Sequence, residues 1–360
     1  MNRQPPDPAR RPAGPSRRSL LGFGLGAGLG AGLALAGCSD SGSSAGSGSA
    51  GGSGSAGGSG SSGTSASPTA PPSVGPSPSP RTVSTVMGKV TVPSSPSRIV
   101  TLDTAELDSV LTLGLTPVGA CRAPVDSGLL DYWASDRLSP VKRVGTIGRP
   151  DLRAIAELEP DLILSSRYRD GSRYRQLSAI APTVLTETTG YPWKSNFRLH
   201  ASALGLDDSV GVVIDAYSAH VANVVDALGG KDKAGAHKVG LVRFVAGRPI
   251  RLYGRKSFAG SVLADVQVGR PGAQDGEVFA TEVDASGIHQ TSDATTLLYA
   301  GYGPAEDSQQ KAVTGGASWR ALPAVAKHQA FPVDDQLWFL GIGYTGANEL
   351  LSQLQYLLGV

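Results

Sequence analysis

A run of apolar residues at three- and four-residue spacing lies near the middle of the chain, within residues 207–228. On a 3.6-residue turn this spacing places every one of them on a single stripe, which is typical of an amphipathic helix and not of a strand. Asp207 or Asp208 can cap the first turn, and Gly229-Gly230 can end the last turn. The pattern predicts one long helix of about 33 Å, either spanning two lobes or packed inside one large domain. The stripe consists of Val210, Val213, Ile214, Tyr217, Val221, Val224, Val225 and Leu228.

Short apolar runs alternate with amphipathic segments before this helix. This βαβ rhythm predicts a parallel sheet flanked by helices. We expect strands at residues 98–103, 117–121, 161–165 and 183–186, and helices at residues 104–113, 152–158 and 174–180.

The part of the chain after the helix repeats the scheme. We therefore expect an α/β fold of two Rossmann-like lobes, residues 83–206 and 229–360, joined by the helix at 207–228. The cleft between such lobes is the expected place for a ligand. The second lobe should have strands at residues 238–245, 250–253, 296–300, 330–333 and 336–340, and helices at residues 258–266, 319–325 and 347–358.

The first 38 residues have the features of an export signal. Arg17-Arg18 lie in a twin-arginine-like stretch, and Leu35-Ala36-Gly37-Cys38 resembles a lipobox, which would make Cys38 a lipidated N-terminus. A transmembrane helix is the weaker alternative, because the apolar run is short and carries six glycines between Gly22 and Gly32. Residues 39–82 are rich in Gly, Ser and Pro and predict a disordered tether. We expect an exported protein, lipid-anchored to the outer face of the cytoplasmic membrane.

The formal charge of +2 conceals an uneven distribution. Residues 1–82 hold six arginines and two aspartates, which leaves 26 basic and 28 acidic residues in the remainder. A nearly neutral folded region argues against a nucleic-acid partner. Cys121 has no second cysteine in the mature chain, so we expect a buried free thiol.

The most conspicuous motif is a GxGxxG pattern at residues 341–346. A dinucleotide fingerprint also needs an acidic residue about 20 positions later, and only 14 residues follow the motif, so we expect the glycines to serve a tight strand-to-helix turn. The five histidines have no metal-ligand spacing, and the folded region has no GxSxG motif. We expect no protein-bound metal and no enzymatic activity.

Arginines stand beside aromatic residues at several predicted strands and loops, namely Arg167-Tyr168-Arg169, Arg243-Phe244 and Arg251-Leu252-Tyr253, with Trp338-Phe339 further on. A solvated surface cluster is the ordinary explanation. A pocket for an oxygen-rich ligand is the other, because guanidinium groups bind such oxygens while aromatic faces cover an apolar skeleton. The residues alone do not decide between the two.

From about residue 88 to residue 360, the chain resembles the ferric-siderophore binding proteins of ABC importers, whose two lobes are joined by one helix. Seven stretches carry the resemblance in order: GKVTVPSSPSRIVTLD, LTLGLTPVGA, IAELEPDLIL, YRQLSAIAPTV, SFAGSVLADVQVGRP, LPAVAKHQAFPVD and WFLGIGYTGANELLSQLQYLL.

The resemblance implies a ferric siderophore in the cleft, with the iron held by the siderophore's own oxygens and no permanently bound cofactor. The stretch SSRYRDGSRYRQL is similar to the hydroxamate-binding branch, which implies a tri-hydroxamate ligand and a ligand contact for Arg169. Further ligand-binding residues implied by the resemblance are Arg167, Arg243, Arg251, Tyr253 and Trp338.

The resemblance also implies a monomer that docks on a membrane permease through one glutamate per lobe. Here Arg153 and Ser286 stand at those two places. Nearby acids could substitute: Asp151, Glu157, Glu282 or Asp284. Alternative functions are a haem or corrinoid binding protein of the same fold, and a surface enzyme acting on a metal chelate.

Overall fold

The computed structural model of this protein describes residues 79–360. The predicted signal peptide (1–38) with its lipidation site Cys38, and the predicted tether as far as residue 78, lie outside the described residues. The first strand begins at Arg81, slightly before the expected start of the N-terminal lobe. Within residues 79–360, no helix has both the length and the apolar composition needed to cross a bilayer.

The N-terminal lobe is built on a six-stranded sheet in the order β6-β5-β4-β3-β7-β8. All neighbours are parallel except β5 and β6. β7 is buried at every position, as expected for an apolar strand covered on both faces. A separate antiparallel hairpin, β1 (Arg81–Thr85) and β2 (Gly88–Val92), precedes the sheet. The strands of the sheet are β3 (Ile99–Thr101), β4 (Gly119–Arg122), β5 (Lys142–Thr146), β6 (Arg149–Pro150), β7 (Leu162–Ser166) and β8 (Thr183–Thr186).

The helices of this lobe begin at residues suited to cap them. Asp103 accepts a hydrogen bond from the Thr104 amide at the start of α1, and Asp151 accepts two from the first turn of α3. The left-handed Gly205 ends α6. The helical segments are α1 (Thr104–Thr112), α2 (Ser135–Leu138), α3 (Leu152–Glu157), α4 (Arg167–Asp170), η1 (Gly171–Arg173), α5 (Tyr174–Ser178) and α6 (Trp193–Leu204).

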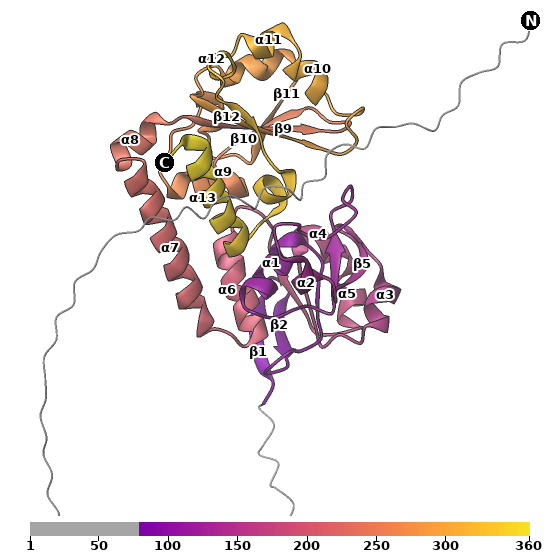
Figure 1. The fold of residues 1–360 in the computed structure, drawn as a ribbon. Coiled ribbons are helices and arrows are strands. Elements are labelled where there is room, and N and C mark those ends of the chain that lie inside the picture. The colour runs from indigo at the N-terminus through magenta and orange to yellow at the C-terminus, as the bar shows by residue number, and fades with distance from the viewer. Residues whose placement is uncertain (1–78) are drawn as a thin grey trace, which may run out of the picture. The chain divides into compact units, whose positions relative to one another are not determined.

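The long helix expected at residues 207–228 corresponds to α7 (Ser209–Ala227), which runs alongside both lobes in Figure 1. Its fully buried residues are Val210, Tyr217 and Val224, one every two turns, and the rest of the apolar stripe is partly buried against the same core. Asp208 occupies the N-cap position, but its side chain makes no capping hydrogen bond, so that part of the prediction is wrong. The short helix α8 (Lys231–Ala236) follows.

The C-terminal lobe has a five-stranded sheet in the order β11-β10-β9-β12-β13. β9, β12 and β13 are parallel, whereas β10 runs antiparallel to both of its neighbours, β9 and β11, so the second lobe does not fully repeat the first. The strands are β9 (Val239–Val245), β10 (Ile250–Tyr253), β11 (Ala280–Val283), β12 (Thr296–Tyr302) and β13 (Ala330–Pro332). The helical segments are α9 (Phe258–Asp265), η2 (Gly272–Gln274), η3 (Ser286–Thr291), α10 (Gln310–Thr314), α11 (Ala317–Arg320), α12 (Pro323–Ala326), η4 (Gln336–Leu340) and α13 (Tyr344–Leu358).

Two local predictions in this lobe are wrong. Residues 336–340 form the π-helix η4 and not a strand, and the Asp334 carboxylate caps its start by accepting the Leu337 amide at 3.0 Å. An apolar run of five residues has no periodicity that separates a strand from a buried helical turn. The helix expected at 319–325 is split into α11 and α12, because a proline at position 323 disfavours helical geometry at Leu322.

Aromatic rings from both lobes interlock at the junction. Trp193 and Phe197 come from α6, Tyr217 from α7, Phe258 from α9 and Tyr344 from α13. Neighbouring rings meet edge to face with centroids 4.7 to 5.6 Å apart, the geometry that aromatic quadrupoles favour. The junction is therefore packed like a protein core rather than like a flexible hinge.

The carboxylate of Asp108 on α1 ties the two lobes together. It accepts the amides of Thr345 at 3.3 Å and Gly346 at 3.0 Å, in the first turn of α13. Thr112 and Tyr132 donate to the same carboxylate at 3.0 and 2.8 Å. Burial raises the pKa of Asp108, and these four donors offset part of that effect.

The GxGxxG glycines make room for this contact. A Cβ on Gly343 would lie 2.0 Å from the Asp108 Oδ1 atom, and a Cβ on Gly346 would lie 1.8 Å from the Gly341 carbonyl oxygen. The element before the turn is a π-helix, so the expected strand-to-helix turn is corrected to a helix-to-helix turn. The motif gives a carboxylate of the same chain close access to the start of a helix.

We predict opposite effects for one substitution at two helical glycines. Gly346→Ala should lower the free energy of unfolding by about 3 kcal/mol or more, because the added methyl cannot fit beside the Gly341 carbonyl. Gly211→Ala is the matched control: no atom lies within 4 Å of its added Cβ in α7, so it should raise stability by up to about 1 kcal/mol. Urea denaturation measures both, and equal midpoints for the two variants would contradict the close packing.

Candidate functional site

A cavity of about 440 Å³ lies between the lobes. Loops that follow the carboxyl ends of β4 and β12 form parts of its two walls, which is where open α/β sheets usually bind ligands. The N-terminal lobe contributes Val125 and Asp126. The C-terminal lobe contributes Gly301, Tyr302, Gly303, Pro304 and Asp335.

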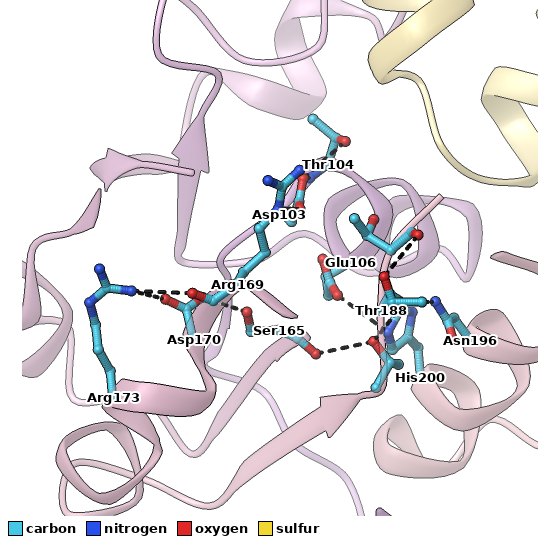
Figure 2. Close-up of polar contacts among 12 residues, drawn as sticks. Asp103, Thr104, Glu106, Ser165, Arg169, Asp170, Arg173, Thr188, Asn196 and His200 are labelled. Carbon is cyan, nitrogen blue, oxygen red and sulfur yellow. Dashed lines mark hydrogen bonds and ion pairs between the residues drawn. The ribbon is translucent and has the colours of Figure 1, made fainter. Parts of the chain in front are cut away.

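Arg169 lies on α4, the short helix directly after β7. Its Nε atom donates to the Asp103 Oδ2 atom at 2.7 Å, while Asp103 Oδ1 accepts the Thr104 amide at 2.7 Å (Figure 2). Burial alone would lower the pKa of Arg169, but the Asp103 carboxylate outweighs it and the pKa lies above its ordinary value. The guanidinium side chain is 32% exposed, and its two Nη atoms have no partner among residues 79–360. Asp103 thus fixes one edge of a charged group whose other edge remains available.

Arg167 and Tyr168 precede Arg169 on the same helix. The Arg167 guanidinium pairs with Glu187, beyond the end of β8, and both side chains are about half exposed. Tyr168 is largely exposed, and the Arg169 guanidinium lies 5.4 Å from the centre of its ring. The structure therefore brings Tyr168 to Arg169 and directs Arg167 to a different partner.

Arg243 on β9 makes the corresponding pair in the C-terminal lobe. Its Nε and Nη2 atoms donate to the two carboxylate oxygens of Asp335, each at 2.6 Å. The guanidinium also lies 4.3 Å from the centre of the Tyr302 ring, at the wall of the cavity. Burial alone would lower the pKa of Arg243, but the Asp335 carboxylate outweighs it and raises the pKa above its ordinary value. This bidentate pair is almost fully buried.

The three other predicted ligand residues differ in exposure and in their partners. Tyr253 is buried, receives a hydrogen bond from Arg243 at 3.3 Å, and packs against Phe339. Arg251 is paired with Arg243 in the β-ladder, yet its Nε atom donates to Glu282 at 3.0 Å. Trp338 is 0% exposed and has no surface to offer a ligand in this structure. None of the six predicted residues lines the cavity itself. Arg243 lies beside Tyr302 of its wall, and Arg169 keeps a partly exposed guanidinium.

A second buried network supports α4. Asp170 accepts a hydrogen bond from the Ser165 hydroxyl at 2.6 Å and pairs with Arg173 at 2.8 Å (Figure 2). Arg173 also donates to the Gly148 carbonyl at 2.7 Å. These contacts hold α4 to the end of β7, so that the backbone beneath Arg169 is well fixed.

Ser109, His200 and Glu106 form a buried constellation that the sequence analysis did not find. The His200 Nδ1 atom lies 2.9 Å from the Ser109 hydroxyl, and its Nε2 atom lies 3.8 Å from the Glu106 Oε1 atom. A serine, histidine and acid are the components of a hydrolase triad. Here the Ser109 hydroxyl donates to the Ala105 carbonyl at 2.8 Å and all three side chains are buried, so this serine is inaccessible to a substrate.

Burial dominates the protonation of this constellation. It raises the pKa of Glu106 to about 8 and lowers that of His200 to about 3. Burial also raises the pKa of the Cys121 thiol, which is free and buried as predicted. In the part of the chain that the structure describes, no group of three or more His, Cys, Asp or Glu residues is arranged to hold a metal ion.

Asp103 and Asp335, the acids that hold the two arginines, were missed by the sequence analysis. Asp103 stands directly after β3 and Asp335 directly before η4, but each pairs with a residue 66 or 92 positions away. Their positions at the ends of elements were the available signal. Neither position identifies the partner without the fold.

The sequence is similar to those of known binding proteins. Residues 99–337 match the family model described as periplasmic binding protein. A probable siderophore-binding lipoprotein of Bacillus subtilis, YfiY, is 34% identical over 76% of this chain and 86% of its own length. The Fe(3+)-citrate-binding protein YfmC of the same organism is 27% identical over 74% of this chain and 84% of its own length.

A solved structure has the same fold. Staphylococcus aureus SirA, complexed with staphyloferrin B, superimposes with a TM-score of 0.69 and 27% sequence identity. The match covers 78% of this chain and 98% of the SirA chain. The two-lobed α/β fold expected from the sequence is thereby confirmed.

We predict that the Arg243–Asp335 pair is a strong structural contact. Asp335→Asn should lower the free energy of unfolding by about 3 kcal/mol, because it leaves the buried Arg243 charge without its carboxylate. Glu157→Gln is the matched control, since it removes the carboxylate of an exposed arginine pair, and it should cost about 0.5 kcal/mol or less. Both are measured by chemical denaturation, and a loss below about 1 kcal/mol for Asp335→Asn would refute the assignment.

Proposed function

The chain belongs to the periplasmic binding protein family, and on that basis we propose that it captures a ferric siderophore and delivers it to an ABC importer. The observation that carries this proposal is the Arg169 guanidinium, which Asp103 holds by one edge while both Nη atoms remain without partners among residues 79–360. A guanidinium edge of this kind binds the oxygens of a chelate without touching the iron. Because Fe(III) is a hard ion already saturated by siderophore oxygens, the protein needs no metal ligands of its own.

The positive charge of Arg169 bears on the class of siderophore, although the charged residues that line the cavity itself, Asp126 and Asp335, are acidic. One relative is named for binding Fe(3+)-citrate. Guanidinium groups pair with carboxylates through two parallel hydrogen bonds. An anionic, carboxylate-bearing ferric chelate is therefore a candidate beside the tri-hydroxamate predicted from the sequence. Haem and corrinoids are less favoured, because the relatives reported above that have a named ligand bind ferric citrate or staphyloferrin B.

The proposed role as a receptor includes attachment to the membrane. We propose that Cys38 is lipidated, that the protein is a monomer at the outer face of the cytoplasmic membrane, and that it has no enzymatic activity. Mass spectrometry of the membrane fraction tests the anchor directly, and an unmodified Cys38 there would exclude it.

Docking on the permease would differ from the pattern implied by the resemblance. Arg153 on α3 is exposed and pairs with Glu157 at 2.9 Å. Ser286 donates to Asp284 at 2.6 Å, and Asp284 is an exposed carboxylate at the start of η3. We propose that Glu157 and Asp284 supply the acidic contacts on the two lobes in place of Arg153 and Ser286.

Intrinsic tryptophan fluorescence tests the ligand class. We predict saturable quenching by ferric siderophores and no saturable quenching by haem or cobalamin. Parallel titrations with ferric citrate and with a ferric tri-hydroxamate decide between the two candidate classes. If haem or cobalamin alone quenches, the fold stands and the proposed ligand is wrong.

We predict that Arg169→Ala weakens binding of the ferric siderophore at least about tenfold, because it removes the partly exposed guanidinium donors of the N-terminal lobe. Arg153→Ala is the matched control, since Arg153 is an exposed arginine on the same lobe, and its Kd should equal that of the wild type. Equal affinities for the two variants would remove Arg169 from the site.

A further inference from the structure

Glu106 is a buried carboxyl group on α1, three residues after the Asp103 that holds Arg169. Its side chain is 0% exposed. Within residues 79–360, neither carboxyl oxygen has a hydrogen-bond partner. A buried ionised carboxylate normally has several donors, so this geometry favours the neutral, protonated acid.

The hydrogen bonds of His200 support the same assignment. The Ser109 hydroxyl donates its only proton to the Ala105 carbonyl, so its oxygen must accept from the Nδ1–H of His200. The Nε2 atom then faces Glu106 across 3.8 Å and has no hydrogen-bond partner in the part of the chain that the structure describes (Figure 2). A lone pair on Nε2 is complementary to a protonated Glu106, whereas an ion pair would bury two charges at a distance too long for a hydrogen bond.

Titratable groups from three helices surround Glu106. Asp103 at the start of α1 and Asp170 on α4 disfavour its ionisation, whereas the nearby backbone amide of Glu106 and Arg169 on α4 favour it. His200 on α6 is neutral because burial lowers its pKa to about 3. The pKa of Glu106 therefore depends on the charges of Arg169 and Asp103. Arg169 is the proposed ligand contact.

We propose that Glu106 sets the affinity of the Arg169 site for anionic ferric chelates, by remaining protonated while such a ligand is bound. This inference rests on the proposed function. An ionised Glu106 would place a negative charge behind Arg169 and would repel an anionic ligand in front of it. A protonated Glu106 leaves the positive charge of Arg169 available to the ligand.

The direction of the pH effect follows from linkage. Burial raises the pKa of Glu106 to about 8 in the free protein, and a bound anion would raise it further. Binding then takes up a proton at pH values between the free and bound pKa. The affinity for an anionic chelate should consequently be constant below about pH 7 and fall as the pH rises above about 8.

The test compares the wild type with Glu106→Gln, which is neutral at every pH, using ferric citrate as the probe. Because ferric citrate itself changes with pH, the informative quantity is the ratio of the two Kd values at each pH. We expect this ratio of wild type to variant to be close to one at about pH 6.5 and to reach up to about ten at about pH 9. A merely structural role would change affinity without this pH dependence.

If the ratio of the two Kd values stays constant between about pH 6.5 and pH 9, the proposed role of Glu106 is overturned. The proposed function as a receptor would still stand in that case, provided that ferric citrate binds saturably. If the wild type binds neither ferric citrate, nor a ferric tri-hydroxamate, nor any other ferric siderophore titrated, the proposed function itself is overturned. If only ferric citrate fails to bind, the same ratio is measured with another ferric siderophore that carries net negative charge. If only uncharged or cationic chelates bind, the proposal is overturned.

A second measurement needs no variant. Infrared difference spectra of wild-type protein with isotope-labelled glutamate follow the protonated carboxyl band of Glu106 and separate it from Asp108. We expect the band to disappear near pH 8 in the free protein and at higher pH with the bound anionic chelate. No protonated glutamate band at about pH 7, or a band that does not respond to the ligand, would refute the proposal.

Discussion

The contact on which the two-lobed architecture depends is a carboxylate of one lobe at the start of a helix of the other. Asp108 on α1 accepts two amides of α13, and the chain has glycine where a Cβ would obstruct this approach. The free amides and the dipole at a helix N-terminus stabilise a negative charge, so the contact is directional as well as close. Together with the interlocked rings of Trp193 and Tyr344, it leaves the junction little freedom to hinge. The binding cleft is consequently preformed, and a ligand need not supply the energy to assemble it.

Both lobes use the same device to present an arginine. Asp103 holds Arg169 by one edge, and Asp335 holds Arg243 by a bidentate pair. The two arginines differ in how many guanidinium donors remain free to bind a ligand. Arg169 is partly exposed with both Nη atoms unpartnered among residues 79–360, whereas Arg243 is nearly enclosed by Asp335, Tyr253 and the Tyr302 ring. A fixed guanidinium loses little conformational entropy when it binds, so Arg169 is suited to contact the ligand and Arg243 to shape the wall.

The sequence predicts elements better than it predicts contacts. The helix α7 and the buried strand β7 follow from periodicity and apolar runs, which are local properties. The turn at residues 336–340 does not, because five apolar residues suit a strand and a π-helix equally. Arg169 could be placed after a strand, at the ligand-binding edge of a parallel sheet. That Trp338 is enclosed while Tyr168 is exposed depends on packing between distant segments, and composition carries no record of it.

The helix α1 carries both the acid that holds Arg169 and the acid that joins the two lobes. Its N-cap, Asp103, holds the arginine of the proposed ligand site, and Asp108, about 8 Å further along the axis, holds the second lobe. Glu106 lies between them and differs from Asp108 in its donors: four donors surround Asp108, whereas no residue among 79–360 donates a hydrogen bond to the carboxyl oxygens of Glu106. Burial raises the pKa of both acids; four hydrogen bonds oppose this for Asp108, whereas only the nearby amide of Glu106 itself and the charge of Arg169 oppose it for Glu106. One rigid helix thus places Asp108, whose charge four donors stabilise, at the lobe junction, and Glu106, whose charge has less support, near the arginine of the proposed ligand site.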